Sequence, residues 1–165
     1  MKIYVLKGHG ERGKSTTLKK LIVDIFDQFP KAKVLYSSRQ CSKLELLNEI
    51  HTERVLRRNT NLHCNVENLQ MVLDVGNKVV AINTAGDNVF EVSKSIILFD
   101  TYKCDVGFCA CRSKGNTGRI LCSKYNGHIE FVPKAEIRNS FLYVNFQDWI
   151  DLLNDWQAEE FLKKI

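Results

Sequence analysis

The sequence has very little proline and no long apolar run. Its 165 residues include only two prolines, Pro30 and Pro133, so no proline-rich linker divides the chain. No apolar stretch approaches the roughly 20 residues that a transmembrane helix needs. The N-terminal apolar residues are interrupted by Gly8, too early for a secretory signal peptide. We therefore expect a single domain over residues 1–165, located in the cytoplasm and without a membrane partner.

The cysteines lack the spacing of a metal site. None of them forms a C-x-x-C pair, which zinc ribbons and zinc fingers require. We expect reduced and mostly buried thiols, as is usual for a cytosolic protein. The six cysteines lie at positions 41, 64, 104, 109, 111 and 122.

The charge is mildly basic, with 24 Lys and Arg residues against 19 Asp and Glu residues. A net charge of +5 favours anionic ligands such as nucleotides but does not require nucleic acid. The most basic stretch contains Arg54, Arg57 and Arg58, and it lacks the interleaved aromatic residues that stack on bases. Nucleic-acid binding is therefore only weakly supported.

A glycine-rich segment at residues 8–15 follows a short apolar strand and precedes an amphipathic helix. It reads GHGERGKS and fits the pattern G-x-x-x-x-G-K-[ST]. Gly8 and Gly13 can adopt the positive φ angles that turn successive backbone N–H groups toward one anion. Lys14 adds a positive charge for the outer phosphates, and the Ser15 hydroxyl is placed to bind magnesium.

The N-terminus of the following helix supplies further N–H donors and the positive end of its dipole. We therefore expect this segment and the first helical residues to bind a nucleotide: Gly8, Gly10, Arg12, Gly13, Lys14, Ser15 and Thr16. The alternative is a glycine turn that only joins a strand to a helix, with Lys14 in solvent. On these residues the chain resembles the P-loop NTPase superfamily.

Strands and helices alternate along the whole chain, which predicts an α/β fold with a mostly parallel sheet covered on both faces. This order agrees with the three-layer P-loop NTPase fold that the resemblance implies. A hairpin around Gly76 should add an antiparallel edge strand. We predict strands at 2–6, 33–36, 69–74, 78–82, 105–111 and 128–132, and helices from 16, 42, 88, 119 and 145.

The predicted helices carry start signals and apolar faces. Ser42 with Glu45, and Asn88 with Glu91, have the spacing of N-terminal capping pairs. The last helix should begin at Asn145, with Asp148 as its capping partner. Its periodicity predicts a buried apolar face made of Phe146, Trp149, Ile150, Leu153, Trp156 and Phe161.

A P-loop enzyme also needs an acidic residue near its magnesium ion, usually at the end of a second strand. The strand at 78–82 ends in Asn83-Thr84-Ala85-Gly86, which resembles the D-T-A-G segment of GTPases with Asn in place of Asp. Asn83 could hold the metal or a metal-bound water without adding charge. Asp87 could supply the carboxylate, or it could simply cap the next helix. The resemblance further implies that the Gly86 N–H contacts a terminal phosphate.

Arg39, Arg112 and Lys114 follow the carboxyl ends of predicted strands, where open α/β sheets bind their ligands. Any of them could stabilise charge in a transition state or bind an acceptor phosphate, and any could simply be solvated. We name Lys14, Asp87, Arg39 and Arg112 as catalytic candidates. The metal candidates are Ser15, Asn83 and Asp87.

Three functions remain open. The first is magnesium-dependent hydrolysis of a nucleoside triphosphate, coupled to a protein partner. The second is a small-molecule or nucleotide kinase. The third is a non-catalytic module whose binding to a partner depends on nucleotide. The chain lacks the N-K-x-D segment with which GTPases read guanine, so ATP is expected rather than strict use of GTP.

Overall fold

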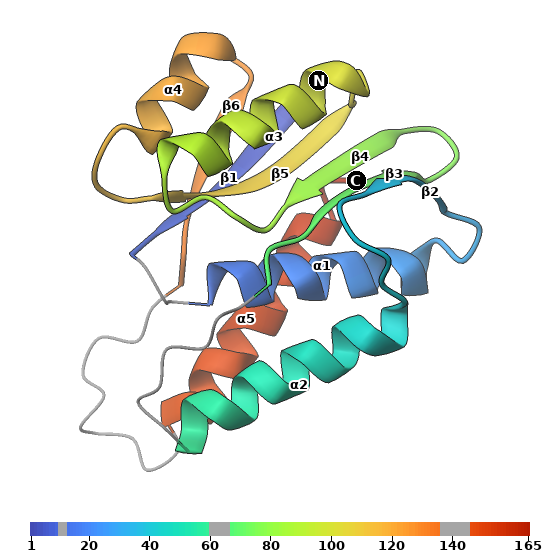
Figure 1. Ribbon diagram of the computed structural model, residues 1–165, viewed down its shortest axis with the longest axis vertical. Coiled ribbons are helices and arrows are strands. Elements are labelled where there is room, and N and C mark those ends of the chain that lie inside the picture. The colour runs from blue at the N-terminus through green and yellow to red at the C-terminus, as the bar shows by residue number, and fades with distance from the viewer. Residues whose placement is uncertain (10–12, 60–66, 136–145) are drawn as a thin grey trace.

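The protein is described by a computed structural model that covers residues 1–9, 13–59, 67–135 and 146–165. In these residues a six-stranded sheet forms the middle layer (Figure 1). Its order is β2-β3-β4-β5-β1-β6. The strands are β1 (Lys2–Gly8), β2 (Lys33–Ser37), β3 (Gln70–Asp74), β4 (Val79–Asn83), β5 (Val106–Arg112) and β6 (Ile129–Pro133).

The sheet is mostly parallel, as the alternation of strands and helices predicted. β4, β5, β1 and β6 pair in parallel, whereas β3 runs antiparallel to both of its neighbours. The hairpin was predicted to place an antiparallel strand at the edge of the sheet. The antiparallel strand is present as β3, but its edge position was wrong, because β2 pairs with the outer side of β3 and forms the edge. The hairpin turn is confirmed: Gly76 has a φ of 100°, and its N–H donates to Asp74 Oδ1 over 2.8 Å.

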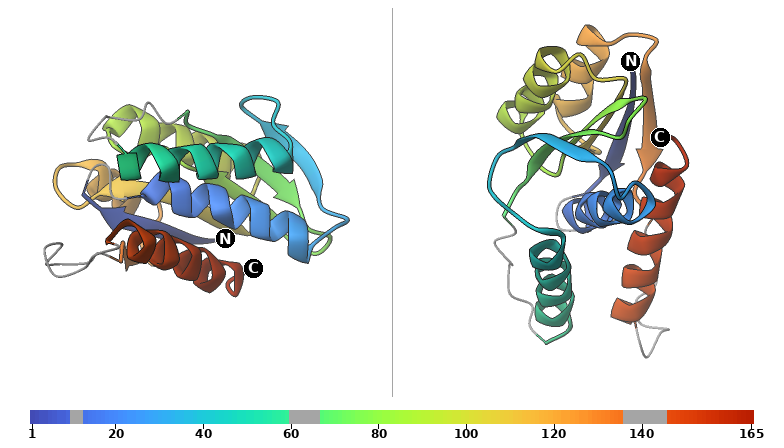
Figure 2. Two further views of the ribbon diagram at one scale, coloured as in Figure 1. Left: turned by 90° about the horizontal axis from the view of Figure 1, so that it is seen from below. Right: turned by 90° about the vertical axis from the view of Figure 1, so that its right-hand side faces the viewer.

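Helices cover both faces of this sheet, which confirms the α/β class (Figure 2). On one face α1 lies directly against the sheet, and α2 and α5 pack against the sides of α1. The opposite face carries α3 and α4. The helices are α1 (Lys14–Gln28), α2 (Lys43–Asn59), α3 (Val89–Thr101), α4 (Thr117–Lys124) and α5 (Phe146–Leu162).

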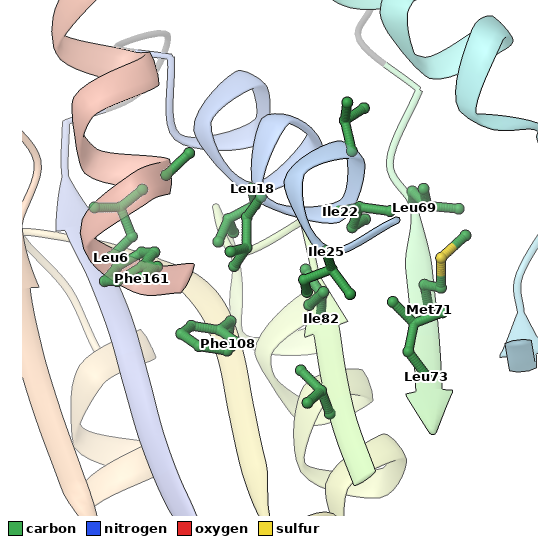
Figure 3. Packing of buried hydrophobic residues seen from close by; sticks show 14 of the residues in the cluster. Leu6, Leu18, Ile22, Ile25, Leu69, Met71, Leu73, Ile82, Phe108 and Phe161 are labelled. Atoms are coloured by element: carbon green, nitrogen blue, oxygen red, sulfur yellow. The ribbon is translucent and has the colours of Figure 1, made fainter. Parts of the chain in front are cut away.

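The alternation of side chains along β1 and β5 divides the core in two. Leu6 and Phe108 face α1, where Phe108 contacts Phe161 of α5 at a ring distance of 5.3 Å (Figure 3). Val5 and Cys109 face α3 and α4 instead. Apolar burial on both faces is the main stabilising term of such a sheet, since each large buried side chain contributes about 1.5–3 kcal/mol.

The cysteines of the described residues are free thiols and most are shielded from solvent. Cys104, Cys109 and Cys111 are buried, Cys41 is half-buried and Cys122 is exposed. Burial raises the pKa of Cys111 to about 11, so this thiol stays protonated at neutral pH. The expectation of mostly buried thiols is therefore confirmed for the described cysteines.

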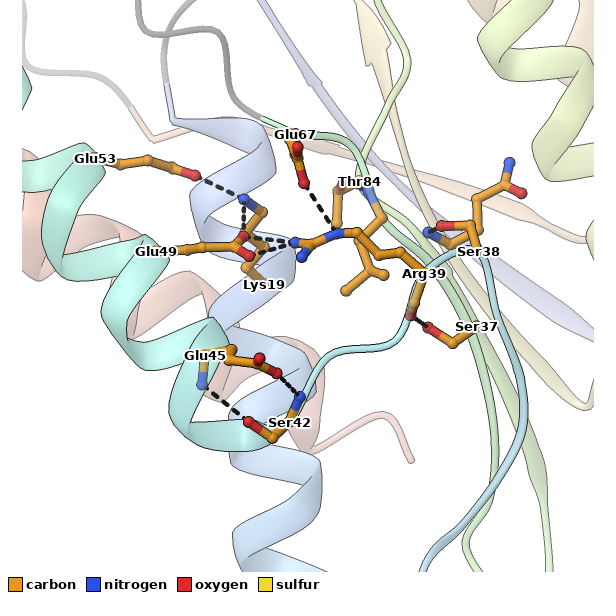
Figure 4. Close-up of polar contacts among 12 residues, drawn as sticks. Lys19, Ser37, Ser38, Arg39, Ser42, Glu45, Glu49, Glu53, Glu67 and Thr84 are labelled. Atoms are coloured by element: carbon orange, nitrogen blue, oxygen red, sulfur yellow. Dashed lines mark hydrogen bonds and ion pairs between the residues drawn. The ribbon is translucent and has the colours of Figure 1, made fainter.

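The capping pairs fix the start of two helices. In α2, the Ser42 N–H donates to Glu45 Oε2 over 2.5 Å, and the Glu45 N–H donates to Ser42 Oγ over 3.2 Å (Figure 4). In α3, Asn88 Oδ1 accepts from the Glu91 N–H over 2.9 Å. The expected cap of α5 at Asn145 lies outside the described residues.

The predicted buried face of α5 is wrong for its two tryptophans. Trp149 and Trp156 are 49% and 52% exposed, whereas Phe161 is buried as expected. Ile150 and Leu153 are half-buried, and the side chain of Phe146 lies outside the described set. Three polar side chains are buried on this helix together with Ala158 and Phe161: Asp151, Asn154 and Gln157.

A buried cluster of charges joins α1 to α2 (Figure 4). Lys19 is only 1% exposed, and its Nζ donates to Glu49 Oε2 over 2.7 Å and to Glu53 Oε1 over 2.8 Å. Arg39 Nη2 lies 2.6 Å from Glu49 Oε1. Glu53 also accepts from Thr16 Oγ1 over 2.7 Å. Removing one partner from such a cluster is costly because it leaves a buried charge uncompensated.

This cluster makes the stability of the fold depend on pH through Glu49. Burial by itself would raise the pKa of Glu49, but hydrogen bonds from Lys19 and Arg39 outweigh burial and lower it. The ionised carboxylate therefore stabilises the fold above the ordinary glutamate pKa of ~4.3. This stabilisation is lost as the pH falls through the lowered pKa of the folded state.

We predict that Glu49→Gln lowers the free energy of unfolding by about 1–3 kcal/mol at pH 7, because the amide replaces a charged acceptor. The difference from the unsubstituted protein should shrink toward pH 3, as measured by urea unfolding. Glu67→Gln is the control, since Glu67 is exposed and lies 3.5 Å from the same arginine. A difference that stays constant between pH 7 and pH 3 would contradict this assignment.

Candidate functional site

A glycine, Gly13, occupies the N-cap position directly before α1. Gly13 precedes α1 with φ 78° and ψ 17°, in the left-handed region that glycine adopts without strain. It has no side chain with which to cap α1, and no side chain of the described residues caps this helix in its place. Gly10 and Arg12, which the sequence also predicted to bind the nucleotide, lie outside the described residues.

Gly8 does not adopt the positive φ that the sequence suggested. Its φ is not positive, so the prediction of a left-handed Gly8 was wrong. A Cβ at Gly8 would instead lie 2.7 Å from Lys134 Cβ, closer than real side chains approach. Gly8 is therefore needed because the chain that follows β6 packs directly against the end of β1.

Lys14 is a buried cation at this end of the sheet. Its side chain is 6% exposed, and its Nζ donates to the His9 carbonyl over 2.6 Å. The same Nζ lies 3.3 Å from Asp87 Oδ1, and Arg112 Nε lies 3.6 Å from that oxygen. The structure thus brings three of the four catalytic candidates together: Lys14, Asp87 and Arg112.

Gly86 allows Asp87 to reach Lys14. β5 lies between β4 and β1, so the segment that leaves β4 must cross the end of β5. A Cβ at Gly86 would lie only 1.9 Å from the Ala110 carbonyl oxygen of β5. The crossing therefore depends on a residue without a side chain, and Asp87 follows it directly.

Ser15 has an unsatisfied hydroxyl. Its Oγ is buried and has no hydrogen-bond partner among the residues that the structure describes. Most buried polar atoms in proteins are hydrogen-bonded, so a hydroxyl without a partner at the start of α1 suits a ligand-binding position. The neighbouring Thr16 differs, because its hydroxyl is already bonded to Glu53.

Asn83 is turned toward α3 instead of toward Lys14. Its Nδ2 donates to Ser95 Oγ over 2.7 Å and to the Glu91 carbonyl over 3.1 Å. Its Oδ1 accepts from the Ala85 N–H over 3.1 Å. The amide thus fixes the end of β4 to α3, and Asp87 is the metal candidate that lies beside Lys14.

Arg39 is held apart from this group. It pairs with Glu49 of α2 and with Glu67 before β3, and burial is the largest influence on its guanidinium (Figure 4). Burial opposes its charge, but the carboxylate of Glu49 outweighs that effect and raises the pKa of Arg39. Arg39 is therefore part of the α1–α2 charge cluster in this structure.

Lys134 is a residue of this region that the sequence did not single out. It follows β6, is buried, and donates from Nζ to Gln157 Oε1 of α5 over 2.8 Å. Its backbone N–H donates to the Lys7 carbonyl over 2.7 Å, beside the start of the glycine-rich loop. The sequence signal was faint, since a lysine that follows a strand and a proline is usually on the surface.

The described residues contain no group of three or more His, Cys, Asp or Glu side chains able to hold a metal ion. Magnesium bound with a nucleotide does not need such a group, because it keeps several waters and takes one or two protein ligands plus phosphate oxygens. Ser15 and Asp87 offer a hydroxyl and a carboxylate, the hard oxygen ligands that magnesium prefers.

Comparisons with models of protein families, with curated proteins and with solved structures found no match. The function is therefore inferred from the geometry of the chain itself. Among the residues described, no helix combines the length and the apolar character needed to cross a membrane.

We predict that Gly86→Ala destabilises the protein by about 1–3 kcal/mol, because the new methyl group would clash with the backbone of β5. Urea unfolding measures this cost. Gly118→Ala is the matched control: a Cβ there would make only ordinary contacts, 3.6 Å from Phe131, within helix α4. Equal stability of the two variants would contradict the crossing role of Gly86.

Proposed function

We propose that this chain has a P-loop NTPase fold and binds a nucleoside triphosphate, ATP in preference to GTP, in a magnesium-dependent manner. It then hydrolyses the γ-phosphoryl group, and the cycle acts on a protein partner. One observation carries the proposal. The buried Lys14 lies 3.3 Å from the Asp87 carboxylate at the N-terminus of α1, and the next residue, Ser15, has a buried hydroxyl without a hydrogen-bond partner among the described residues.

Phosphate binding rests on α1 and Lys14. The N–H groups at the start of α1, which no side chain of the described residues caps, favour an anion at this point together with the helix dipole. Lys14, the first residue of α1, adds a full positive charge. Its ammonium group already lies beside an acid, the Asp87 carboxylate. Because Asp87 is about half exposed, its ion pair with Lys14 is weak and can be exchanged for phosphate at little cost.

Asp87 therefore has two successive partners in this account. Without nucleotide it neutralises Lys14. With nucleotide the phosphates take over Lys14, and the carboxylate is available to magnesium together with Ser15. Bound magnesium would supply positive charge to the β- and γ-phosphate oxygens.

Arg112 is the residue placed to stabilise charge that develops on the transferred phosphoryl group. Its Nε lies 3.6 Å from Asp87, and its side chain is about half exposed, so it can move to a ligand. A guanidinium suits this task because it donates two parallel hydrogen bonds to phosphate oxygens.

A non-catalytic nucleotide-binding module is the second candidate, and the position of Asn83 favours it. P-loop enzymes usually carry an acidic residue at the end of this strand. Here the position is occupied by Asn83, whose side-chain amide is hydrogen-bonded to α3. Asp87 is then the one carboxylate within 4 Å of Lys14 among the described residues. A kinase is the third candidate. It differs from a hydrolase in transferring the γ-phosphoryl group to an acceptor other than water.

The experiment uses ATP labelled at the γ-phosphate, with Mg²⁺ or with EDTA, and compares the unsubstituted protein with Asp87→Asn. The unsubstituted protein should bind Mg-ATP and release labelled phosphate without an added acceptor. Asp87→Asn should weaken Mg-ATP binding about tenfold or more, which corresponds to roughly 1.4 kcal/mol. In EDTA the variant should bind ATP at least as well as the unsubstituted protein, because Lys14 loses its competing anion.

Glu130→Gln is the matched control, since Glu130 pairs with Lys2 at the start of β1, away from Lys14. It should leave binding and turnover unchanged. Tight Mg-ATP binding without phosphate release would favour the non-catalytic module, and label transferred to an added nucleoside phosphate would favour a kinase. Absence of any ATP binding by the unsubstituted protein would overturn the proposal.

A further inference from the structure

One hydrogen bond ties the first turn of α1 to the second half of α2. Thr16, the residue after Ser15, donates from Oγ1 to Glu53 Oε2 over 2.7 Å. Thr16 is fully buried and Glu53 is 6% exposed, so little water competes for this contact. The two residues lie 37 positions apart in the sequence, and only the packing of α2 beside α1 brings them together.

The other carboxylate oxygen of Glu53 is bonded to α1 as well. Glu53 Oε1 accepts from Lys19 Nζ over 2.8 Å, and Lys19 is only 1% exposed (Figure 4). Thr16 and Lys19 are three positions apart on α1 and therefore lie on one face of that helix. The bond from the ammonium group is charge-assisted and accordingly strong. Because both oxygens of Glu53 are bonded to α1, the first turn of α1 resists displacement relative to α2.

This first turn lacks the usual means of holding the start of a helix. Gly13 is the N-cap residue, and no side chain of the described residues caps α1. A side-chain cap ordinarily contributes about 1 kcal/mol, and helix ends fray easily. The bond between Thr16 and Glu53 holds this turn from the side instead, one residue from the Ser15 hydroxyl.

Phosphate binding depends on the orientation of the same turn. The phosphates would accept hydrogen bonds from the N–H groups at the start of α1, and such bonds weaken steeply when the donors are misaligned. A displacement of about 1 Å at a binding site can cost as much as about 100-fold. A residue that fixes Thr16 therefore also fixes the phosphate donors beside it.

We propose that Glu53 is a positioning residue of the nucleotide site, that it acts through Thr16, and that this contact links occupancy of the site to α2. The inference rests on the nucleotide binding proposed above. Glu53 itself lies on α2 and touches α1, not the phosphates. Because coupling of this kind is reciprocal, a bound nucleotide also makes α2 harder to open.

A double-mutant cycle, followed by calorimetric titration of Mg-ATP, tests the positioning role. The proteins are the unsubstituted chain, Thr16→Val, Glu53→Gln and the double variant. Valine removes the hydroxyl but keeps the shape of threonine, and glutamine offers one acceptor oxygen in place of two. Each single variant should bind Mg-ATP about five- to tenfold more weakly. The double variant should bind no more weakly than the weaker single variant, because both substitutions break the same contact.

Glu49→Gln is the matched control for loss of stability. Glu49 accepts from the same Lys19 over 2.7 Å, but its second partner is Arg39, away from the first turn of α1. It should therefore lower stability, as predicted above, and still bind Mg-ATP like the unsubstituted protein. Losses that multiply in the double variant, equal weakening by Glu49→Gln, or full affinity of Glu53→Gln would each overturn this inference alone. Absence of Mg-ATP binding by the unsubstituted protein would overturn the proposed function and this inference together.

Hydrogen exchange of the α2 amides tests the link to α2 without any substitution of Glu53, so it applies even where Glu53→Gln does not fold. Saturating Mg-ATP should slow this exchange in the unsubstituted protein. Thr16→Val, saturated with Mg-ATP at higher concentration, should show no such slowing. Equal slowing in both proteins, or none in either, would overturn the inference.

Discussion

A buried ammonium group at the start of α1 constrains the end of the sheet around it. Removing a lysine charge from water is expensive unless oxygens replace the lost hydration. Lys14 finds the His9 carbonyl at 2.6 Å and the Asp87 carboxylate at 3.3 Å. Both contacts depend on glycines, since Gly13 turns the chain into α1 and Gly86 lets the next loop cross β5. The geometry of the site therefore follows from how this one charge is compensated.

The helical layer on that face is held by polar contacts as well as by apolar ones. α1 packs its apolar side on the sheet, and its other sides carry Thr16, Thr17 and Lys19 toward α2 and α5. Thr16 is bonded to Glu53 one residue after Ser15. A displacement of the first turn of α1 would therefore be transmitted directly to α2. The same use of polar contacts leaves the tryptophans of α5 on the outside.

Much of the fold could be predicted from the sequence because its signals are local. The strands, the turn at Gly76 and the Ser42–Glu45 cap each depend on residues close together in the chain. The features that failed depend on distant partners. The edge position of β2 depends on which side of β3 is free, and the burial of α5 depends on Thr17, Arg54 and Lys134 as polar partners.

The candidate site shows the same division. The loop motif predicted that Lys14 and Ser15 lie together at the start of a helix, because they are adjacent in the sequence. It left Asn83 and Asp87 as open alternatives, and Arg39 as an equal of Arg112. Only the strand order separates them, since the crossing of β5 at Gly86 carries Asp87 to Lys14. The pairing of Arg39 with Glu49 across α2 has no local signal at all.

The central claim is that Lys14 and the N-terminus of α1 bind a polyphosphate. Calorimetric titration of Mg-ATP into Lys14→Ala tests it most directly, with Lys7→Ala as the control because Lys7 is exposed and lies over the Phe131 ring. We expect Lys14→Ala, shown to be folded by its circular dichroism, to bind Mg-ATP about 100-fold more weakly. Lys7→Ala should bind like the unsubstituted protein. Equal affinity of Lys14→Ala and the unsubstituted protein would contradict the account.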